Sequence, residues 1–105
     1  MYGKLLSFMG VKISRRVEKK LLEKHRVTRK ELIECFENRE RHALRDTREA
    51  HDSDPPTWWM ISETHHLRRL KVIYVVKGGH AVIKSAYEPE PEAEYIFRTK
   101  APYLN

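Results

Sequence analysis

The chain has 105 residues, of which 40% are hydrophobic and 34% are charged. This composition is that of a globular protein rather than a disordered chain, and the length predicts one domain over residues 1–105. The longest apolar run, Val72 to Val76, is far too short to span a membrane, so no membrane contact is expected. The formal net charge of +6 favours an anionic partner, either nucleic acid or an acidic protein.

The only cysteine and the N-terminus both favour a cytoplasmic location. Cys35 cannot form an internal disulfide, which fits a reducing compartment. Its apolar neighbours in a helical pattern predict a buried, inert thiol. No secretion signal is recognisable at the start of the chain, and residues 1–10 are expected to be either disordered or a short strand.

A first helix is predicted over residues 15–25, after a short strand at residues 11–13. Ser14 is a suitable N-cap residue for this helix. Its apolar positions recur at helical spacing: Val17, Leu21 and Leu22.

A second helix is predicted to follow at once. Thr28 and Glu31 form a capping-box pattern, and the helix should end near Asn38. Its apolar stripe consists of Leu32, Cys35 and Phe36. Since each helix has one apolar face, both must pack against another element.

Basic residues are crowded into the first thirty positions. Ten of them accompany only two acidic residues, Glu18 and Glu23. The ten are Lys4, Lys12, Arg15, Arg16, Lys19, Lys20, Lys24, Arg26, Arg29 and Lys30. This pattern is as consistent with a solvated helix surface as with a surface that contacts phosphates.

The second half of the chain predicts an antiparallel sheet. Residues 57–64, 70–77 and 80–87 are rich in β-branched and aromatic residues, and residues 42–46 are a weaker fourth candidate. Gly78-Gly79 predicts a two-residue hairpin turn, and the polar residues 47–56 predict a loop. Pro91 suits the first turn of a final helix, whose apolar stripe is Ala93, Ile96 and Phe97. The expected fold class is α+β: two N-terminal helices, a three- to four-stranded antiparallel meander and one C-terminal helix.

The turns also predict which strand residues are neighbours. The Gly78-Gly79 turn pairs Lys77 with His80, Val75 with Val82 and Ile73 with Lys84. A loop over residues 65–69 would pair Glu63 with Lys71, Ile61 with Ile73 and Trp59 with Val75. One face then holds the core residues Trp58, Met60, Leu70, Val72, Tyr74, Val76, Ala81 and Ile83. All helices, through Leu21, Leu32, Phe36 and Phe97, are expected to pack against Trp58, Tyr74 and Ile83 on this face.

The opposite face is expected to be open and basic. It holds Trp59, Ile61, Glu63, Lys71, Ile73, Val75, Lys77, His80 and Lys84. Such a face suits single-stranded RNA, because bases stack on Trp59 while Lys77, His80 and Lys84 hold phosphates. The alternative is structural: Trp59 packs under the loop of residues 47–56, and Glu63–Lys71 is an ordinary surface ion pair.

The loop of residues 46–56 is the densest polar cluster. His51 is its best candidate for proton transfer, because an imidazole titrates near neutral pH. Asp46, His51, Asp52 and Asp54 match no known spacing of metal ligands, so no metal and no other cofactor are expected. Arg48 could equally serve structure, by bridging Asp46 to a strand, or catalysis.

Most of the chain, from residues 23–28 through the second helix to residues 70–75 and 83–86, resembles the BrnT branch of the RelE/ParE-type toxins. Residues 46–51, 55–59 and 85–89 are similar to a group of small proteins that are often labelled ADP-ribosyl-(dinitrogen reductase) hydrolase. Established hydrolases of that name are much larger, all-helical and metal-dependent, so the toxin resemblance is preferred.

The resemblance implies metal-independent cleavage of RNA by attack of a 2′-hydroxyl on the adjacent phosphate. Since Glu63 and Lys71 are expected to be neighbours on the open face, and the loop with Arg48 and His51 could fold over it, we assign the roles there. Lys71 and Arg48 would stabilise the phosphate, and Glu63 or His51 would act as base. Tyr87 would act as acid, although strict alternation places it on the core face unless the strand end twists or bulges. The implied partners are RNA, with or without the ribosome, and an antitoxin protein. The sequence does not decide between a monomer and a homodimer.

Tyr87 departs from the pattern of these toxins, since BrnT-type sequences commonly carry a basic residue at this position. The sequence therefore also allows a protein that has lost nuclease activity. This alternative is a non-catalytic module that binds RNA or protein on the same fold. An ADP-ribosyl hydrolase is the third alternative.

Overall fold

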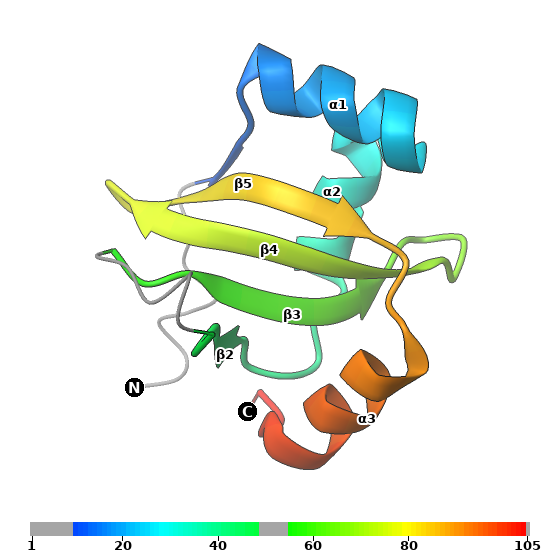
Figure 1. Cartoon of the computed structure of the whole chain (residues 1–105), viewed down its shortest axis with the longest axis vertical. Helices are drawn as coiled ribbons and strands as arrows, with labels where there is room; N and C mark the ends of the chain where they lie inside the picture. Colours follow the sequence, from blue (N-terminus) through cyan, green and yellow to red (C-terminus); the bar gives the residue numbers. More distant parts are fainter. Residues whose placement is uncertain (1–9, 49–54, 105) are drawn as a thin grey trace.

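The computed structural model describes residues 10–48 and 55–104, and it confirms the α+β class (Figure 1). The elements in chain order are β1 (Gly10–Lys12), α1 (Arg15–His25), α2 (Arg29–Glu37), β2 (Leu44–Arg45), β3 (Trp58–Glu63), β4 (Arg69–Lys77), β5 (His80–Tyr87) and α3 (Pro91–Lys100). Among these described elements, none of the helices has both the length and the apolar character that a membrane crossing requires.

The sheet has five strands in the order β1-β5-β4-β3-β2. From β2 to β5 the strands form the expected antiparallel meander. β1 instead pairs in parallel with β5, with Gly10 opposite His80. The meander is thus confirmed with four strands, and the difference is that the short N-terminal strand joins the sheet as a fifth, parallel strand. A three-residue strand carries too little pattern to reveal its partner, and here β1 covers backbone groups that would otherwise form an exposed sheet edge.

Both N-terminal helices begin where their caps predict. The Ser14 hydroxyl accepts a hydrogen bond of 3.2 Å from the Val17 N–H at the start of α1. At α2 the capping box is complete: the Glu31 N–H donates to the Thr28 hydroxyl, and the Thr28 N–H donates to the Glu31 carboxylate. These bonds satisfy N–H groups that have no partner within the helix.

α2 packs on the core face of the sheet. The Phe36 and Tyr74 rings meet edge to face, with centroids 5.2 Å apart, and the Ser62 hydroxyl donates a 2.7 Å hydrogen bond to the Cys35 carbonyl. Cys35 is fully buried, and burial raises the pKa of its thiol to about 12. The prediction of a buried core cysteine is confirmed, and a raised pKa disfavours the reactive thiolate.

α3 packs on the opposite face, which corrects the prediction that all helices cover the core face. The centres of the Phe97 and Trp59 rings are 5.6 Å apart. Glu94 of the same helix accepts two hydrogen bonds of 2.8 Å from Arg69. In Figure 1 the sheet hides part of α2, whereas α3 lies beside β3 at the lower edge. This second face is also apolar along its centre, since Ile61, Ile73 and Val75 are at most 9% exposed. It is not the open face that the sequence predicted.

The β3–β4 register differs from the prediction by two residues. Glu63 lies opposite Arg69, and Lys71 lies opposite Ile61. The turn begins at Thr64, whose N–H donates to the Arg68 carbonyl at 2.9 Å. Because side chains alternate with a period of two, this shift changes the neighbours but leaves every residue on its predicted face.

The β4–β5 hairpin contains a bulge that the sequence did not reveal. Gly78 and Gly79, with φ of 57° and 78°, form the predicted turn, and Lys77 lies opposite His80. Beyond Tyr74, however, the partner of Ile73 is Ser85 rather than Lys84. The extra residue, Lys84, reverses the alternation of the last three residues of β5. Tyr87 therefore lies directly opposite Lys71.

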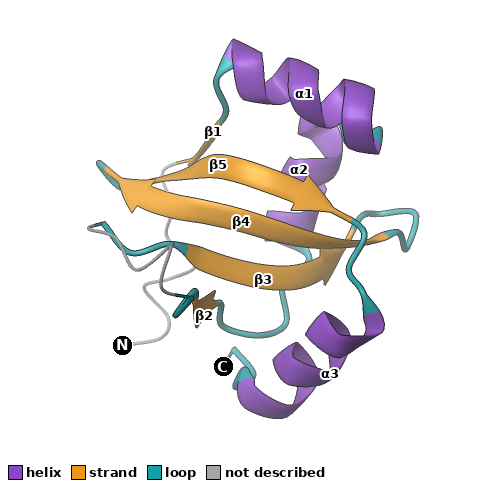
Figure 2. Cartoon of the chain, in the orientation of Figure 1, coloured by secondary structure: helices purple, strands orange, loops and turns teal. Residues whose placement is uncertain are grey.

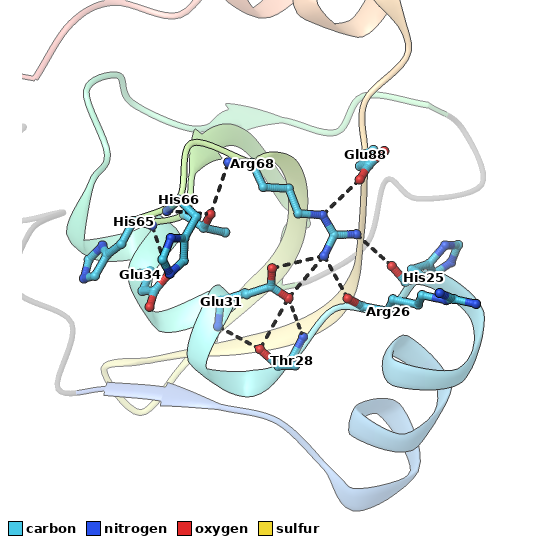
Figure 3. A network of polar contacts seen from close by, with 10 residues as sticks. His25, Arg26, Thr28, Glu31, Glu34, His65, His66, Arg68 and Glu88 are labelled. Carbon is cyan, nitrogen blue, oxygen red and sulfur yellow. Dashed lines mark hydrogen bonds and ion pairs between the residues drawn. The ribbon is translucent and has the colours of Figure 1, made fainter.

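Arg68 connects three segments at one end of the molecule (Figure 3). Its guanidinium donates to the carbonyls of His25 and Arg26 at 2.9 and 2.8 Å, where α1 ends. It also donates to the carboxylates of Glu31 in α2, at 3.1 Å, and of Glu88 after β5, at 2.9 Å. One side chain thus fixes the α1–α2 junction against the β3–β4 turn and the segment that leads to α3.

Two carboxylates that bind arginines, Glu31 and Glu94, should make the protein less stable in acid. The pKa of Glu94 is lowered mainly by the hydrogen bond from Arg69. Burial raises the pKa of Glu31, but the hydrogen bonds from Thr28 and Arg68 together lower it by more. Each folded-state pKa thus lies below the ordinary value of 4.5. The stabilisation is present above the unfolded pKa and is lost as the pH falls through the folded one.

We therefore expect the midpoint of urea unfolding to fall between about pH 6 and about pH 3. The double variant Glu31→Gln/Glu94→Gln should show a smaller fall than the wild type. An equal fall in both proteins would show that these carboxylates do not contribute.

Candidate active site

Lys71 lies between two aromatic side chains of the neighbouring strands. Its Nζ atom is 4.6 Å from the centre of the Trp59 ring in β3 and 6.0 Å from that of Tyr87 in β5. Alternation along β3 and β4, together with the bulge in β5, places all three on the same face. Both rings attract the ammonium through cation–π interactions and hold it in place.

The electrostatic surroundings of Lys71 suit a bound anion. Burial lowers the pKa of its ammonium, the positive charge of Arg48 lowers it further, and the charges of Asp46 and Glu90 oppose this. Across residues 10–48 and 55–104, no carboxylate forms an ion pair with Lys71. A half-buried cation without a paired carboxylate, close to a second cation, favours an incoming phosphate.

Arg48 is held in place by Asp46. Its Nε and Nη2 atoms donate to the two oxygens of that carboxylate at 3.1 and 2.9 Å, and its backbone N–H donates at 3.1 Å. Asp46 is buried and is anchored by its own N–H, which donates to the Thr57 carbonyl at 2.7 Å. The Arg48 side chain is 61% exposed, so it is both oriented and accessible.

His25 is a residue that sequence reasoning missed. The centres of the His25 and Tyr87 rings are 5.4 Å apart, and both residues line a shallow hollow together with Lys24. No local pattern could have revealed this contact, because it joins the end of α1 to the end of β5. An imidazole beside Tyr87 is a further candidate for proton transfer.

The remaining predicted site residues are dispersed. Glu63 lies opposite Arg69 rather than opposite Lys71, and its Oε2 atom is 3.8 Å from the Nη1 atom of Arg69. Lys77 and His80 flank the hairpin turn, six residues along β4 from the Lys71–Tyr87 pair, or about 20 Å. Lys84 is exposed at the bulge. His51 lies outside the described residues.

Trp59 is half-buried, and its ring contacts Phe97 as well as Lys71. Helix α3 therefore covers part of the Trp59 ring. The cover that the structural alternative predicted, the loop of residues 47–56, lies mostly outside the described residues. Over the described part of the chain, no three His, Cys, Asp or Glu side chains gather as metal ligands would.

Lys71, Trp59, Tyr87 and Arg48 form what we call the Lys71 cluster. The fold and this cluster define a small α+β protein with a cationic and aromatic surface site. Its fold is that of a known toxin: the crystal structure of the Brucella abortus ribonuclease toxin BrnT superposes with a TM-score of 0.51. The superposition covers 78% of this chain and 97% of BrnT at 16% sequence identity, so the likeness concerns the fold. No family model matches the chain, and no curated protein matches it significantly. The expected BrnT-like fold is thus supported, whereas the ADP-ribosyl hydrolase label has no support.

Proposed function

We propose that this protein cleaves RNA without a metal, as a toxin of the RelE/BrnT kind whose partner is an antitoxin. The observation that carries the proposal is the position of Lys71 between Trp59 and Tyr87, with the oriented Arg48 near it. The BrnT-like fold supports it independently. The other predicted partners, the ribosome and a second copy of the chain, belong to the same proposal.

The reaction would be attack of an RNA 2′-hydroxyl on the adjacent phosphorus atom. The new O2′–P bond displaces the 5′-oxygen of the next nucleotide and leaves a 2′,3′-cyclic phosphate. Lys71 and Arg48 would stabilise the charge on the phosphate oxygens, and Tyr87 would give its proton to the leaving oxygen. The accessible part of the Trp59 ring would stack on a base.

Three side chains are candidates for the base that accepts the 2′-hydroxyl proton. His51 and Glu63 follow from the sequence, and Glu63 would first have to leave Arg69. His25 follows from its contact with Tyr87. Separate His25→Ala, His51→Ala and Glu63→Ala variants should identify the base as the one whose loss removes the acid limb of the pH–rate profile.

The proposal is tested with the wild-type protein. We expect growth arrest on overexpression, and cleavage of RNA, with or without ribosomes, that continues in the presence of a chelator and leaves cyclic phosphate ends. A protein that neither arrests growth nor cleaves RNA under either condition would contradict it.

Two observations favour a non-catalytic binding module instead. The predicted base Glu63 is held by Arg69, and Tyr87 occupies the position where BrnT-type sequences commonly carry a cation. A binding module would hold RNA tightly but leave it intact after prolonged incubation, which separates the two functions.

Salt dependence should reveal the phosphate contacts on the sheet. If Lys71, Lys77 and Lys84 each neutralise one phosphate, their joint replacement by alanine should lower the slope of log affinity against log salt by about 2 for single-stranded RNA. Fluorescence anisotropy between about 50 and 200 mM salt measures the slope. An unchanged slope would exclude these lysines as phosphate contacts.

A further inference from the structure

The net positive charge of the chain resides in one segment. Residues 10–30 contain nine lysines and arginines and two glutamates, a net charge of +7, whereas the whole chain carries +6. The rest of the chain therefore has a net charge of −1. The sheet that holds Lys71 contributes little to the attraction of a polyanion over long distances, and the segment around α1 supplies it.

This charge lies on the outer surface of α1 and on the residues that flank the helix. α1 packs against β5 through Leu21, which is 1% exposed. The exposed cations are Lys12, Arg15, Arg16, Lys19, Lys20, Lys24, Arg26, Arg29 and Lys30. Within the described ranges none of the nine forms an ion pair, in contrast to Arg48, Arg68 and Arg69, each of which binds a carboxylate.

The basic surface of α1 leads directly to the candidate active site. Figure 2 shows the last turn of α1 near the end of β5, where His25 contacts Tyr87. Lys24 lines the same hollow as these two residues, and the Nζ atom of Lys71 is 6.0 Å from the centre of the Tyr87 ring. Along the helix, cations four residues apart, such as Arg16, Lys20 and Lys24, rise by about 6 Å per step. They form a row that ends beside Tyr87.

We propose that α1 binds the sugar-phosphate backbone of the RNA strand where the strand continues beyond Tyr87. This inference rests on the proposed function and assigns the affinity to α1 and the chemistry to the Lys71 cluster. The surface consists of flexible cations, with Leu22 as the one large apolar side chain exposed on the helix. Contacts of this kind hold phosphates and do not read bases, so binding along α1 would be independent of sequence.

The test compares RNAs of two lengths. Lys19→Gln/Lys20→Gln removes two cations from α1 while keeping good helix formers, and Arg98→Gln/Lys100→Gln removes two exposed cations from α3 as the matched control. The probes are a labelled single strand of about 20 nucleotides and one of about 5, which offers too few phosphates to contact the Lys71 cluster and the whole of α1 at once. For the long strand, the α1 variant should lose about 1.4 in the salt slope, at about 0.7 per phosphate. Its loss of salt slope should be smaller for the short strand.

Each other outcome has a definite meaning. If the wild type binds the long strand with a steep salt slope that the α1 variant retains, the inference is wrong and the proposed function stands. If the α1 variant keeps the slope but loses binding to an acidic antitoxin, α1 is a protein-docking surface and the inference is also wrong. If the variant loses slope as expected but the wild type does not cleave, the inference holds and the proposed cleavage fails. Absence of RNA binding by the wild type overturns both.

Discussion

Replacement of Lys71 by alanine is expected to slow RNA cleavage about a hundredfold or more. Loss of one preorganised group that stabilises charge in the transition state typically has an effect of this size. The rate should be measured in single turnover at saturating protein, so that weaker binding does not contribute. Lys100→Ala, which removes an exposed cation from α3, is the control and should keep the wild-type rate.

The circular dichroism spectrum shows whether a slower Lys71→Ala variant is still folded. Lys71 is half-buried at the surface of the sheet, so Lys71→Ala should keep the circular dichroism spectrum of the wild type. A variant that is folded and fully active would exclude Lys71 from the reaction.

Arg48 gives an independent check on the same cluster. Because its charge is one cause of the lowered pKa of Lys71, Arg48→Ala should raise that pKa toward its ordinary value as well as slow cleavage. Observation of the Lys71 ammonium by NMR during a pH titration measures the shift. A pKa of Lys71 that does not change in Arg48→Ala would show that the two cations act separately.

Replacement of Arg68 by alanine is expected to lower the free energy of unfolding by about 2–3 kcal/mol. The guanidinium is 25% exposed and donates to two carbonyls at the end of α1 and to two carboxylates on other segments. Its removal leaves the His25 and Arg26 carbonyls without this donor and leaves Glu31 without its cation. Charged hydrogen bonds contribute more than neutral ones, and the loss of one partner exposes the desolvation cost of the other.

The neighbouring residue is a matched control for this prediction. Arg69 also binds two carboxylates, Glu63 and Glu94, but its side chain is 44% exposed. Arg69→Ala should therefore lower the free energy of unfolding by less than about 1 kcal/mol, as is usual for surface ion pairs. Urea unfolding of both variants at neutral pH measures the difference. Equal losses would show that Arg68 is an ordinary surface cation.

Features that depend on neighbouring residues could be predicted from the sequence. The Ser14 cap, the Thr28–Glu31 capping box and the Gly78-Gly79 turn all form as expected, because each involves residues at most three positions apart. The alternation of apolar residues likewise predicted the buried residues Met60, Leu70, Val72 and Tyr74 of the core face, but Val76, also expected there, is 37% exposed. Lys71 and Arg48 were expected together because the loop that holds Arg48 could fold over the face that holds Lys71, and the charge of Arg48 contributes to the lowered pKa of Lys71. Their role toward an anion stays a prediction.

The arrangement of the site depends on tertiary structure. An apolar stripe shows that a helix must be buried but not on which side of a sheet, so the packing of α3 against Trp59 could not be predicted. The bulge at Lys84 leaves no signature in the sequence, yet it alone moves Tyr87 from the core face to a position opposite Lys71. The contact between His25 and Tyr87 joins distant parts of the chain, and only the completed fold brings them together. Local hydrogen bonds and periodicity therefore determine the elements, whereas long-range packing decides which side chains meet.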